Sequence, residues 1–192
     1  MTKLRSHDPH MRVFFALWPN AAERAAMAVW QPPLRKLCGG KAMRADTLHA
    51  TLVFLGDVPA HRLEALKLAA EEVGGEPFEL DFDSARYWGH NHIAYAAPSV
   101  VPAPLSQLVL DLEQRLRAHR FRFDRRDYKP HVTMLRHAQW SDEPLPELPE
   151  VAWRVRDFAL VQSLSDEQGA RYEVLARFPL GRCGPLGLRR VV

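Results

Sequence analysis

Two copies of one four-residue pattern constrain this chain more than any other feature of its sequence. Each copy is a histidine followed two positions later by a threonine and then by an apolar residue: His49-Ala50-Thr51-Leu52 and His131-Val132-Thr133-Met134. The 192 residues include nine histidines and only four threonines, so chance placement would produce far less than one such pair. Both copies lie in stretches where apolar residues alternate, as in a half-buried β-strand. We therefore expect two strands with the same role.

The spacing within each copy has a direct structural meaning. Residues two positions apart on a strand point to the same face, so each copy presents an imidazole beside a hydroxyl while its apolar residues face the core. Two such strands lying close together would bring two imidazoles and two hydroxyls into one small volume. Imidazole can accept or donate a proton near pH 7, and threonine hydroxyls can donate to phosphate oxygens. The pattern therefore indicates general acid–base chemistry at phosphorus.

The rest of the sequence predicts further strands and three amphipathic helices. Strands are expected at residues 13–18, 48–55, 78–82, 85–88, 92–97, 131–135, 152–163 and 170–178. Helices are expected after Asn20, where Glu23 completes a capping-box pattern, after Pro59, and after Pro102 and Pro104.

Proline and glycine indicate where the predicted helices and strands end, and the order of these elements indicates the fold class. The first helix is expected to run to Pro32, and Gly56 to close the strand at 48–55. Strands and helices do not alternate strictly, and hairpin-like pairs favour antiparallel sheets, so the sequence predicts an α+β fold. We expect one domain over residues 12–180, a flexible leader over 1–11 and a C-terminal tail over 181–192.

Composition excludes several classes of protein. An apolar fraction of 47 % and a charged fraction of 26 % are those of a globular domain rather than a disordered chain or a coiled coil. No run of about 18 apolar residues, the length of a membrane span, occurs. The two cysteines, Cys38 and Cys183, suit a reducing compartment. The sequence therefore indicates a cytoplasmic protein with no membrane partner.

Charge is unevenly distributed along the chain. The net charge is only +3, but residues 115–136 hold eight basic side chains against Asp124 and Asp127. The basic residues are Arg115, Arg117, Arg120, Arg122, Arg125, Arg126, Lys129 and Arg136. Such an excess suits a phosphate-rich partner, but it is equally typical of a solvated helix end and loop. Charge alone leaves both interpretations open.

Other chemistries find little support. A zinc site needs three or four histidine, cysteine or carboxylate ligands, and neither motif contains an acid or a cysteine. No nucleophile elbow and no glycine-rich phosphate loop before a helix is present. The other seven histidines have no matched partner, and we interpret them as surface residues. Catalysis by the paired motifs remains the favoured hypothesis.

On these residues the chain resembles the 2H phosphoesterase superfamily, which is named for two His-x-Thr/Ser-x motifs. Within it, the chain is similar to the bacterial and archaeal RNA 2′,3′-cyclic phosphodiesterases, also called 2′-5′ RNA ligases. The resemblance extends in family order over about residues 12–180. It rests on residues 12–19, 48–56, 129–136, 158–163 and 172–176. One departure is Met134, where the family usually has leucine.

The resemblance implies a fold and a role for each site residue. The fold is bilobal and pseudo-symmetric, with two antiparallel sheets flanked by helices around a central cleft. His49 is expected to donate a proton to the departing 3′ oxygen, and His131 to accept one from the attacking water. Thr51, Thr133 and Arg136 are expected to hold the phosphate oxygens. Arg136 lies an odd number of positions after His131, so this role requires the strand to end or bend there.

The resemblance also implies a substrate. Family members hydrolyse RNA 2′,3′-cyclic phosphates to 2′-phosphomonoesters, and some join RNA ends in 2′-5′ linkages. We therefore expect a monomeric RNA-processing enzyme that uses no cofactor or metal and acts on RNA with 2′,3′-cyclic phosphate termini, tRNA-like fragments among them. Two alternatives stay open: another 2H activity, on 2′-5′ oligonucleotides or small cyclic phosphates, and a non-catalytic RNA-end-binding protein.

Overall fold

The computed structural model describes residues 8–125, 127–141, 143–166 and 169–181. The strands are β1 (His10–Leu17), β2 (Lys41–Ala42), β3 (Ala50–Pro59), β4 (Phe78–Phe82), β5 (Ser84–Trp88), β6 (Ile93–Ala97), β7 (Val132–Arg136), β8 (Val151–Val155), β9 (Asp157–Asp166) and β10 (Gly169–Pro179). The helices are α1 (Ala21–Ala28), α2 (Gln31–Cys38), α3 (Leu63–Glu71) and α4 (Ala103–Ala118), with short 3-10 turns η1 (Ala45–Thr47) and η2 (Ala60–Arg62). The predicted α+β class is confirmed.

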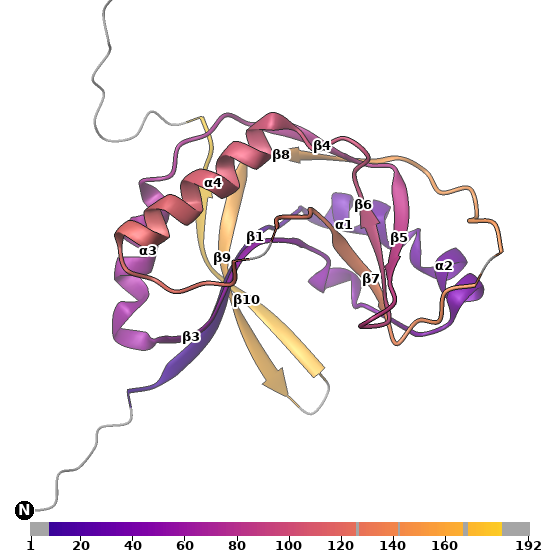
Figure 1. Ribbon diagram of the computed structural model, residues 1–192, viewed down its shortest axis with the longest axis horizontal. Helices are drawn as coiled ribbons and strands as arrows, with labels where there is room; N and C mark the ends of the chain where they lie inside the picture. The colour runs from indigo at the N-terminus through magenta and orange to yellow at the C-terminus, as the bar shows by residue number, and fades with distance from the viewer. Residues whose placement is uncertain (1–7, 126, 142, 167–168, 182–192) are drawn as a thin grey trace, which may run out of the picture.

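Two four-stranded antiparallel sheets form two lobes (Figure 1). The first has the order β10-β9-β1-β3, and α3 and α4 pack against it. The second has the order β2-β7-β6-β5, with α2 against β7. A two-stranded ribbon of β4 and β8 joins the lobes along one side, and α1 packs on β8. The bilobal arrangement expected from the resemblance is confirmed, with β3 in one lobe and β7 in the other.

The first predicted helix is in fact two helices. Helix α1 starts with the expected capping box, in which the Asn20 side chain accepts from the Glu23 N–H and the Glu23 carboxylate accepts from the Asn20 N–H. It ends at Ala28, and α2 begins at Gln31 with prolines in its first turn. A proline there lacks only an N–H that the helix would leave unbonded. The prediction that Pro32 ends a helix was therefore wrong, because this proline starts one.

Three strand boundaries also differ from prediction. The predicted strand at 152–163 is two strands that belong to different sheets: β8 pairs with β4, whereas β9 pairs with β1 and β10. Gly56 does not close β3, because its positive φ of 74° lets the strand continue past a bulge to Pro59. Strand β1 begins at His10, opposite Pro59. Residues 1–7 and 182–192, the rest of the predicted leader and tail, lie outside the described residues.

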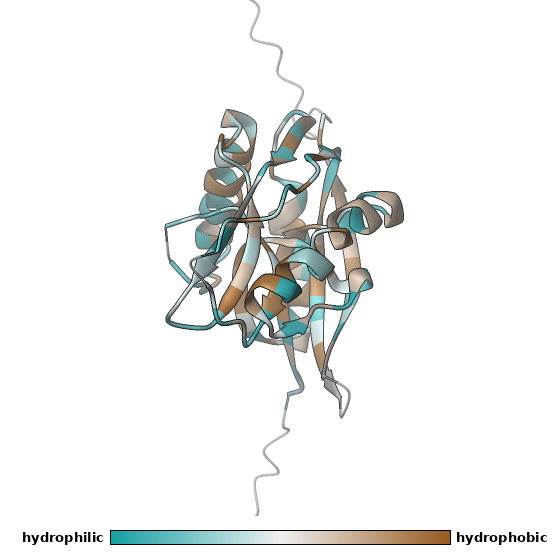
Figure 2. Ribbon diagram, turned by 90° about the vertical axis from the view of Figure 1, so that its right-hand side faces the viewer, coloured by the Kyte–Doolittle hydropathy of each residue, from teal (hydrophilic) through white to brown (hydrophobic). Residues whose placement is uncertain are grey.

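The core lies between the sheets and their helices. The largest fully buried side chains include Trp30, Trp153, Phe15, Phe82 and Phe158. Strands β4 and β8 both show the strict alternation of buried and exposed residues that the sequence predicted for half-buried strands. Hydrophobic positions gather on the strands, while the peripheral loops are mostly hydrophilic (Figure 2). No helix in the described part of the chain is long and apolar enough to cross a membrane.

Candidate active site

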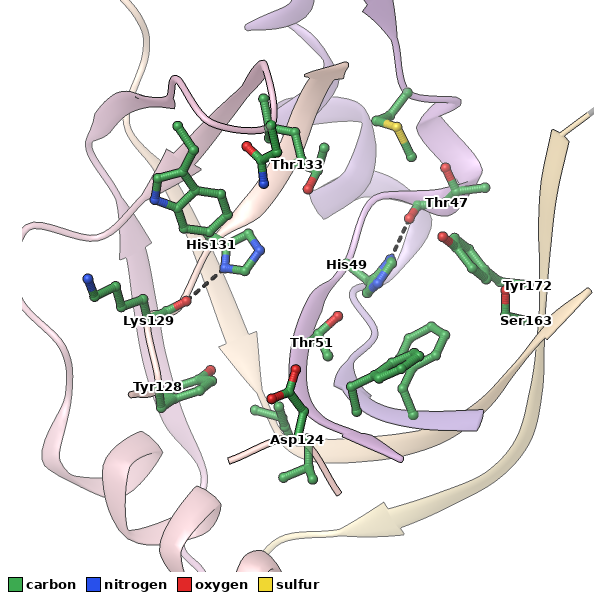
Figure 3. A pocket seen from close by; sticks show the side chains of 18 of the residues that line it. Thr47, His49, Thr51, Asp124, Tyr128, Lys129, His131, Thr133, Ser163 and Tyr172 are labelled. Carbon is green, nitrogen blue, oxygen red and sulfur yellow. Dashed lines mark hydrogen bonds between the residues drawn. The ribbon is translucent and has the colours of Figure 1, made fainter. Parts of the chain in front are cut away.

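The two motifs line one cavity between the lobes. The cavity has a volume of about 760 Å³. Its walls include all five residues that the sequence singled out, His49 and Thr51 from the first lobe and His131, Thr133 and Arg136 from the second. Figure 3 shows the two imidazoles on opposite walls with Thr51 and Thr133 beside them. The predicted site residues are therefore brought together from two different sheets, although His49 and His131 lie just before β3 and β7 and not, as predicted, inside the strands.

Both imidazoles are held in the same way by the backbone. The Nδ1–H of His49 donates to the carbonyl oxygen of Thr47 at 2.7 Å, and the Nδ1–H of His131 donates to that of Lys129, also at 2.7 Å (Figure 3). Because a carbonyl can only accept, Nδ1 must carry the hydrogen in both rings. Each Nε2 therefore has a free lone pair when the ring is neutral, and neither Nε2 bonds to a described residue. The Nε2 atoms of His49 and His131 are therefore two equivalent proton acceptors.

Each motif contains a β-bulge at its fourth residue. In the β1–β3 pair, Phe15 lies opposite Val53 and Ala16 opposite Thr51, so Leu52 is an extra residue. In the β6–β7 pair, Met134 is the extra residue in the same way. A bulge places two consecutive residues of one strand toward the same face. Leu52 and Met134 are accordingly both buried together with the residue that follows each of them.

The bulges explain how a residue five positions after each histidine reaches the cavity. Without the bulge Arg136 would face the core, but the extra residue at Met134 turns it back to the cavity wall. This is the bend that its expected role requires. The equivalent residue in the first motif is Phe54, which also lines the cavity. The cavity thus repeats in its imidazoles, hydroxyls and bulges, but it has an aromatic ring on one side and a guanidinium on the other.

Aromatic rings surround His49. Its ring centroid lies 5.0 Å from that of Phe14, 5.3 Å from that of Trp18 and 5.1 Å from that of Tyr172. Burial lowers the pKa of His49 to about 4, although the hydrogen bond to the Thr47 carbonyl opposes this change; the guanidinium of Arg136, and a proton on His131 when that ring is charged, act in the same direction as burial. His49 is therefore neutral at pH 7 in the free protein.

His131 has a similar but smaller aromatic environment. The edge of Trp88 lies against it with a centroid distance of 4.5 Å, and Tyr95 lies at 5.7 Å. Burial lowers the pKa of His131, while the Lys129 carbonyl opposes this change. Both imidazoles are thus neutral in the free protein at pH 7, and one of them must gain a proton before the pair can act as acid and base.

Of the basic residues at 115–136 that the structure describes, only Lys129 and Arg136 line the cavity. Arg115 lies 3.4 Å from both Glu72 and Asp111, and Arg117 forms an ion pair with Glu113. Arg126 lies outside the described residues. Arg115 and Arg117 therefore contribute to the surface of α4 rather than to the cavity.

Sequence reasoning missed several groups at the site. The carbonyls of Thr47 and Lys129 are backbone atoms, which no residue pattern reveals. The rings of Phe14, Trp18 and Tyr172 lie in segments whose apolar residues indicated only strands. The histidine at position 90, interpreted as a surface residue, is exposed but also lines the cavity. No group of three or more histidine, cysteine, aspartate or glutamate side chains suited to a metal ion occurs among the described residues.

Comparisons with known proteins agree on one family. The family model described as LigT like Phosphoesterase matches residues 17–95 and 96–172, so each match contains one motif. The RNA 2′,3′-cyclic phosphodiesterase of Escherichia coli K12 is 31 % identical over 170 residues, which cover 88 % of this chain and 96 % of that protein. The protein of the same name from Thermus thermophilus is 29 % identical over 183 residues, 88 % of this chain and 90 % of that protein.

Comparison with solved structures indicates the same family. The crystal structure of E. coli LigT in apo form superposes with a TM-score of 0.79 at 30 % identity and covers 90 % of this chain and 99 % of its own. The crystal structure of E. coli LigT complexed with 3′-AMP also has a TM-score of 0.79, at 29 % identity, and covers 91 % of this chain and 100 % of its own. The similarity therefore extends over both lobes and the cavity between them.

Proposed function

Since the chain belongs to the LigT-like phosphoesterase family, within the 2H phosphoesterases, we propose that it is an RNA 2′,3′-cyclic phosphodiesterase. The reaction opens the five-membered cyclic phosphate at the 3′ end of an RNA. Water adds to phosphorus, the bond from phosphorus to the 3′ oxygen breaks, and a 2′-phosphomonoester with a free 3′-hydroxyl remains. If a 5′-hydroxyl of a second RNA takes the place of water, the same step forms a 2′-5′ linkage.

The two imidazoles divide the proton transfers. Nε2 of neutral His131 takes the proton of the attacking water, and Nε2–H of protonated His49 gives its proton to the departing 3′ oxygen. The proton count balances, and the two rings end with their protonation states exchanged. In the reverse direction the roles exchange as well. The assignment of acid and base follows the family, because the two rings have the same tautomer and the same type of backbone partner.

The cavity offers donors for the charge on the phosphate. Thr51 and Thr133 lie beside the two histidines, and Arg136 adds a fixed positive charge on the His131 side. We assign these groups to the two non-bridging oxygens, whose charge they would stabilise as the pentacoordinate transition state forms. The anionic substrate would also favour protonation of an adjacent imidazole, because an opposite charge nearby raises the pKa of a histidine. Substrate binding itself would therefore help to charge His49.

One observation favours this proposal over a non-catalytic RNA-end-binding protein. Two half-buried imidazoles from different lobes present their unbonded Nε2 atoms to the same cavity, each fixed by a carbonyl two residues earlier. A protein that only binds RNA ends would gain nothing from two uncharged proton acceptors at the phosphate site. Crystal structures of E. coli LigT complexed with 3′-AMP and with phosphate support a ligand that carries a phosphate group.

The decisive experiment identifies the product of a single assay. An RNA oligonucleotide with a 2′,3′-cyclic phosphate is incubated with the protein and excess EDTA, and the product is identified by its phosphate position. We expect a 2′-phosphate, with kcat reduced about 10²–10⁴-fold in His49→Ala and in His131→Ala. A 3′-phosphate product, or loss of turnover on chelation, would contradict the proposal. Hydrolysis of 2′-5′ oligonucleotides in preference to cyclic ends would point to another 2H activity.

A further inference from the structure

A second hollow lies where the first lobe meets the β4–β8 ribbon, beyond the active-site cavity. It has a volume of about 320 Å³ and no role in the chemistry described above. The end of β1, the start of α1, the junction of β8 and β9, and β10 form its walls. They contribute Leu17, Trp18, Pro19, Asn20, Glu23, Trp153, Arg154, Val155, Arg156, Asp157 and Arg177. We call it the arginine hollow.

The register of the first sheet places the arginine hollow and the cavity on the same face. Alternate residues of β9 share a face, so Ser163, which lines the cavity, points the same way as Asp157, which lines the arginine hollow. On β10, Tyr172 lies opposite Ser163, and a bulge at Leu175 brings Arg177 opposite Ala159 on this face. From Ser163 to Asp157 a strand extends about 20 Å. One continuous surface of that length therefore connects the two sites.

The surface between the sites is aromatic and apolar. Trp18, Tyr172 and Val174 are partly exposed there, packed on a small buried cluster that includes Ala159 and Val161. The ring of Trp18 stacks on His49 with a centroid distance of 5.3 Å, and the guanidinium of Arg24 lies 5.7 Å from the Trp18 ring. We call Trp18, Tyr172 and Val174 the Trp18–Val174 ledge; a partly exposed surface with aromatic rings and an arginine beside them is of the kind on which the bases of single-stranded nucleic acid stack.

The carboxylates in the arginine hollow are already engaged, while one arginine is not. Glu23 accepts hydrogen bonds from the backbone N–H groups of Asn20 and Arg154, and Asp157 forms an ion pair with Arg177 at 2.7 Å. The exposed side chain of Arg156 forms no ion pair with any described residue. An anion that enters the arginine hollow would therefore meet an available guanidinium.

We propose that the RNA nucleotides upstream of the cyclic phosphate leave the cavity over the Trp18–Val174 ledge and place a backbone phosphate at Arg156 in the arginine hollow. The inference takes the position of the cyclic end from the proposed function. Because a 2′,3′-cyclic phosphate is the 3′ end of its strand, every other nucleotide lies on the 5′ side and must follow a single path. The basic stretch at 115–136 offers a rival path, and its exposed Arg122 provides a matched control.

The test measures binding and turnover separately. A fluorescent single-stranded RNA hexanucleotide ending in a 2′-phosphate, which is not turned over, is titrated with the protein by anisotropy at several salt concentrations. We expect Arg156→Glu to weaken binding about fivefold or more and to reduce the slope of log affinity against log salt by about 0.7, the value for one lost single-strand phosphate contact. Arg122→Glu should leave both values as in the wild type. Hydrolysis of a 2′,3′-cyclic mononucleotide, which is too short to reach the arginine hollow, should be the same in all three proteins.

The outcomes are distinct. Equal effects of the two substitutions, no effect of Arg156→Glu, or a larger effect of Arg122→Glu would overturn the path. A parallel loss of mononucleotide hydrolysis in Arg156→Glu would also overturn it, since the residue would then act at the cavity. If the wild-type protein hydrolyses no cyclic phosphate, the proposed function fails, but the binding measurements still decide whether the hexanucleotide contacts Arg156.

Discussion

Phe54 and Arg136 occupy equivalent positions on the two walls of the cavity, each five residues after its motif histidine and each turned inward by a bulge. Almost every other part of the two motifs repeats, including the tautomer of the imidazole and its backbone partner. The difference between a ring and a guanidinium therefore breaks the symmetry of the cavity. We expect a bound phosphate to lie nearer Arg136, although the guanidinium of Arg12, 4.9 Å from the centroid of the Phe54 ring, also lines the cavity on the other side.

Removal of the Arg136 charge should impair phosphate stabilisation with little effect on folding, because the side chain is exposed at the end of β7. We expect Arg136→Gln to lower kcat/KM for a 2′,3′-cyclic nucleotide about 100-fold, the usual effect of losing one transition-state donor. Arg136→Lys should recover part of the loss, because it restores the charge without the planar guanidinium. Arg122→Gln, which removes a charge away from the cavity, serves as control. Wild-type activity in Arg136→Gln would contradict the assignment.

The lowered pKa values of the two histidines predict the pH dependence of activity. Catalysis needs one protonated ring, and in the free protein the pKa of His49 is about 4 and that of His131 lies below 6.5. The singly protonated form therefore declines about tenfold per pH unit above the higher of the two pKa values. We expect log kcat/KM to fall with a slope near −1 from below pH 6.5 upward.

The pH dependence of kcat provides the internal control. It reports the pKa values of the enzyme–substrate complex, in which we expect the bound phosphate anion to raise the pKa of the imidazole beside it. The alkaline limb of kcat should therefore lie at higher pH than that of kcat/KM. Identical alkaline limbs in the two profiles would show that the bound phosphate does not raise the pKa of the imidazole, whereas a kcat/KM that rises above pH 7 would show that the free protein does not hold both rings neutral.

The backbone at Gly40 predicts a local effect on stability. Gly40 has a φ of +84°, and a Cβ atom there would lie 2.6 Å from the Arg136 carbonyl oxygen and 3.0 Å from the Ala138 nitrogen. We expect Gly40→Ala to lower the free energy of unfolding by about 3 kcal/mol, from left-handed strain and from the clash. Gly56→Ala has a similar φ of +74° but only an ordinary contact with Phe54 at 3.7 Å, so it should cost about 1 kcal/mol. Chemical denaturation measures both, and equal losses would contradict the clash.

The fold was predictable wherever one strand or helix face is buried throughout. The strand at 78–82 and the helix stripe of Leu105, Leu108, Leu112 and Leu116 were found with nearly correct bounds, because period 2 and period 3.6 report burial directly. The segment at 152–163 was misread as one strand. Both Val155 and Phe158 are buried in the core, so the alternation changes phase across Arg156, at the point where the pairing partner changes from β4 to β1 and β10. Periodicity reveals which face is buried and says nothing of which strand lies alongside.

The candidate site was also predictable only where the period of the strand places residues on one face. His49 with Thr51, and His131 with Thr133, reach the cavity because residues two apart share a face. Phe54 went unnoticed, and although the sequence required the strand to end or bend before Arg136, it did not reveal a bulge, because a bulge depends on the pairing of two strands. Aromatic residues such as Trp18 gave no signal of their own, since a ring beside a histidine and a ring in the core have the same sequence pattern.

Trp18 should control the protonation of His49. Its ring stacks on the imidazole and takes part in the burial that lowers the pKa of His49 to about 4. We expect Trp18→Leu to admit water and to raise this pKa toward 6.5, with little change at His131, as followed by NMR titration of the imidazole resonances. Trp88→Leu is the matched control, because Trp88 contacts His131, and it should raise the pKa of that residue instead.

The same shift predicts how stability depends on pH. The folded-state pKa of His49 is lower than the unfolded value of about 6.5, so the unfolded state binds more protons between the two. The free energy of unfolding should therefore decrease as the pH falls from 6.5 toward 4. In Trp18→Leu this decrease should be smaller, because the folded-state pKa has moved toward the unfolded one. If His49 titrates at the same pH in the wild type and in Trp18→Leu, the indole is not what keeps this imidazole neutral.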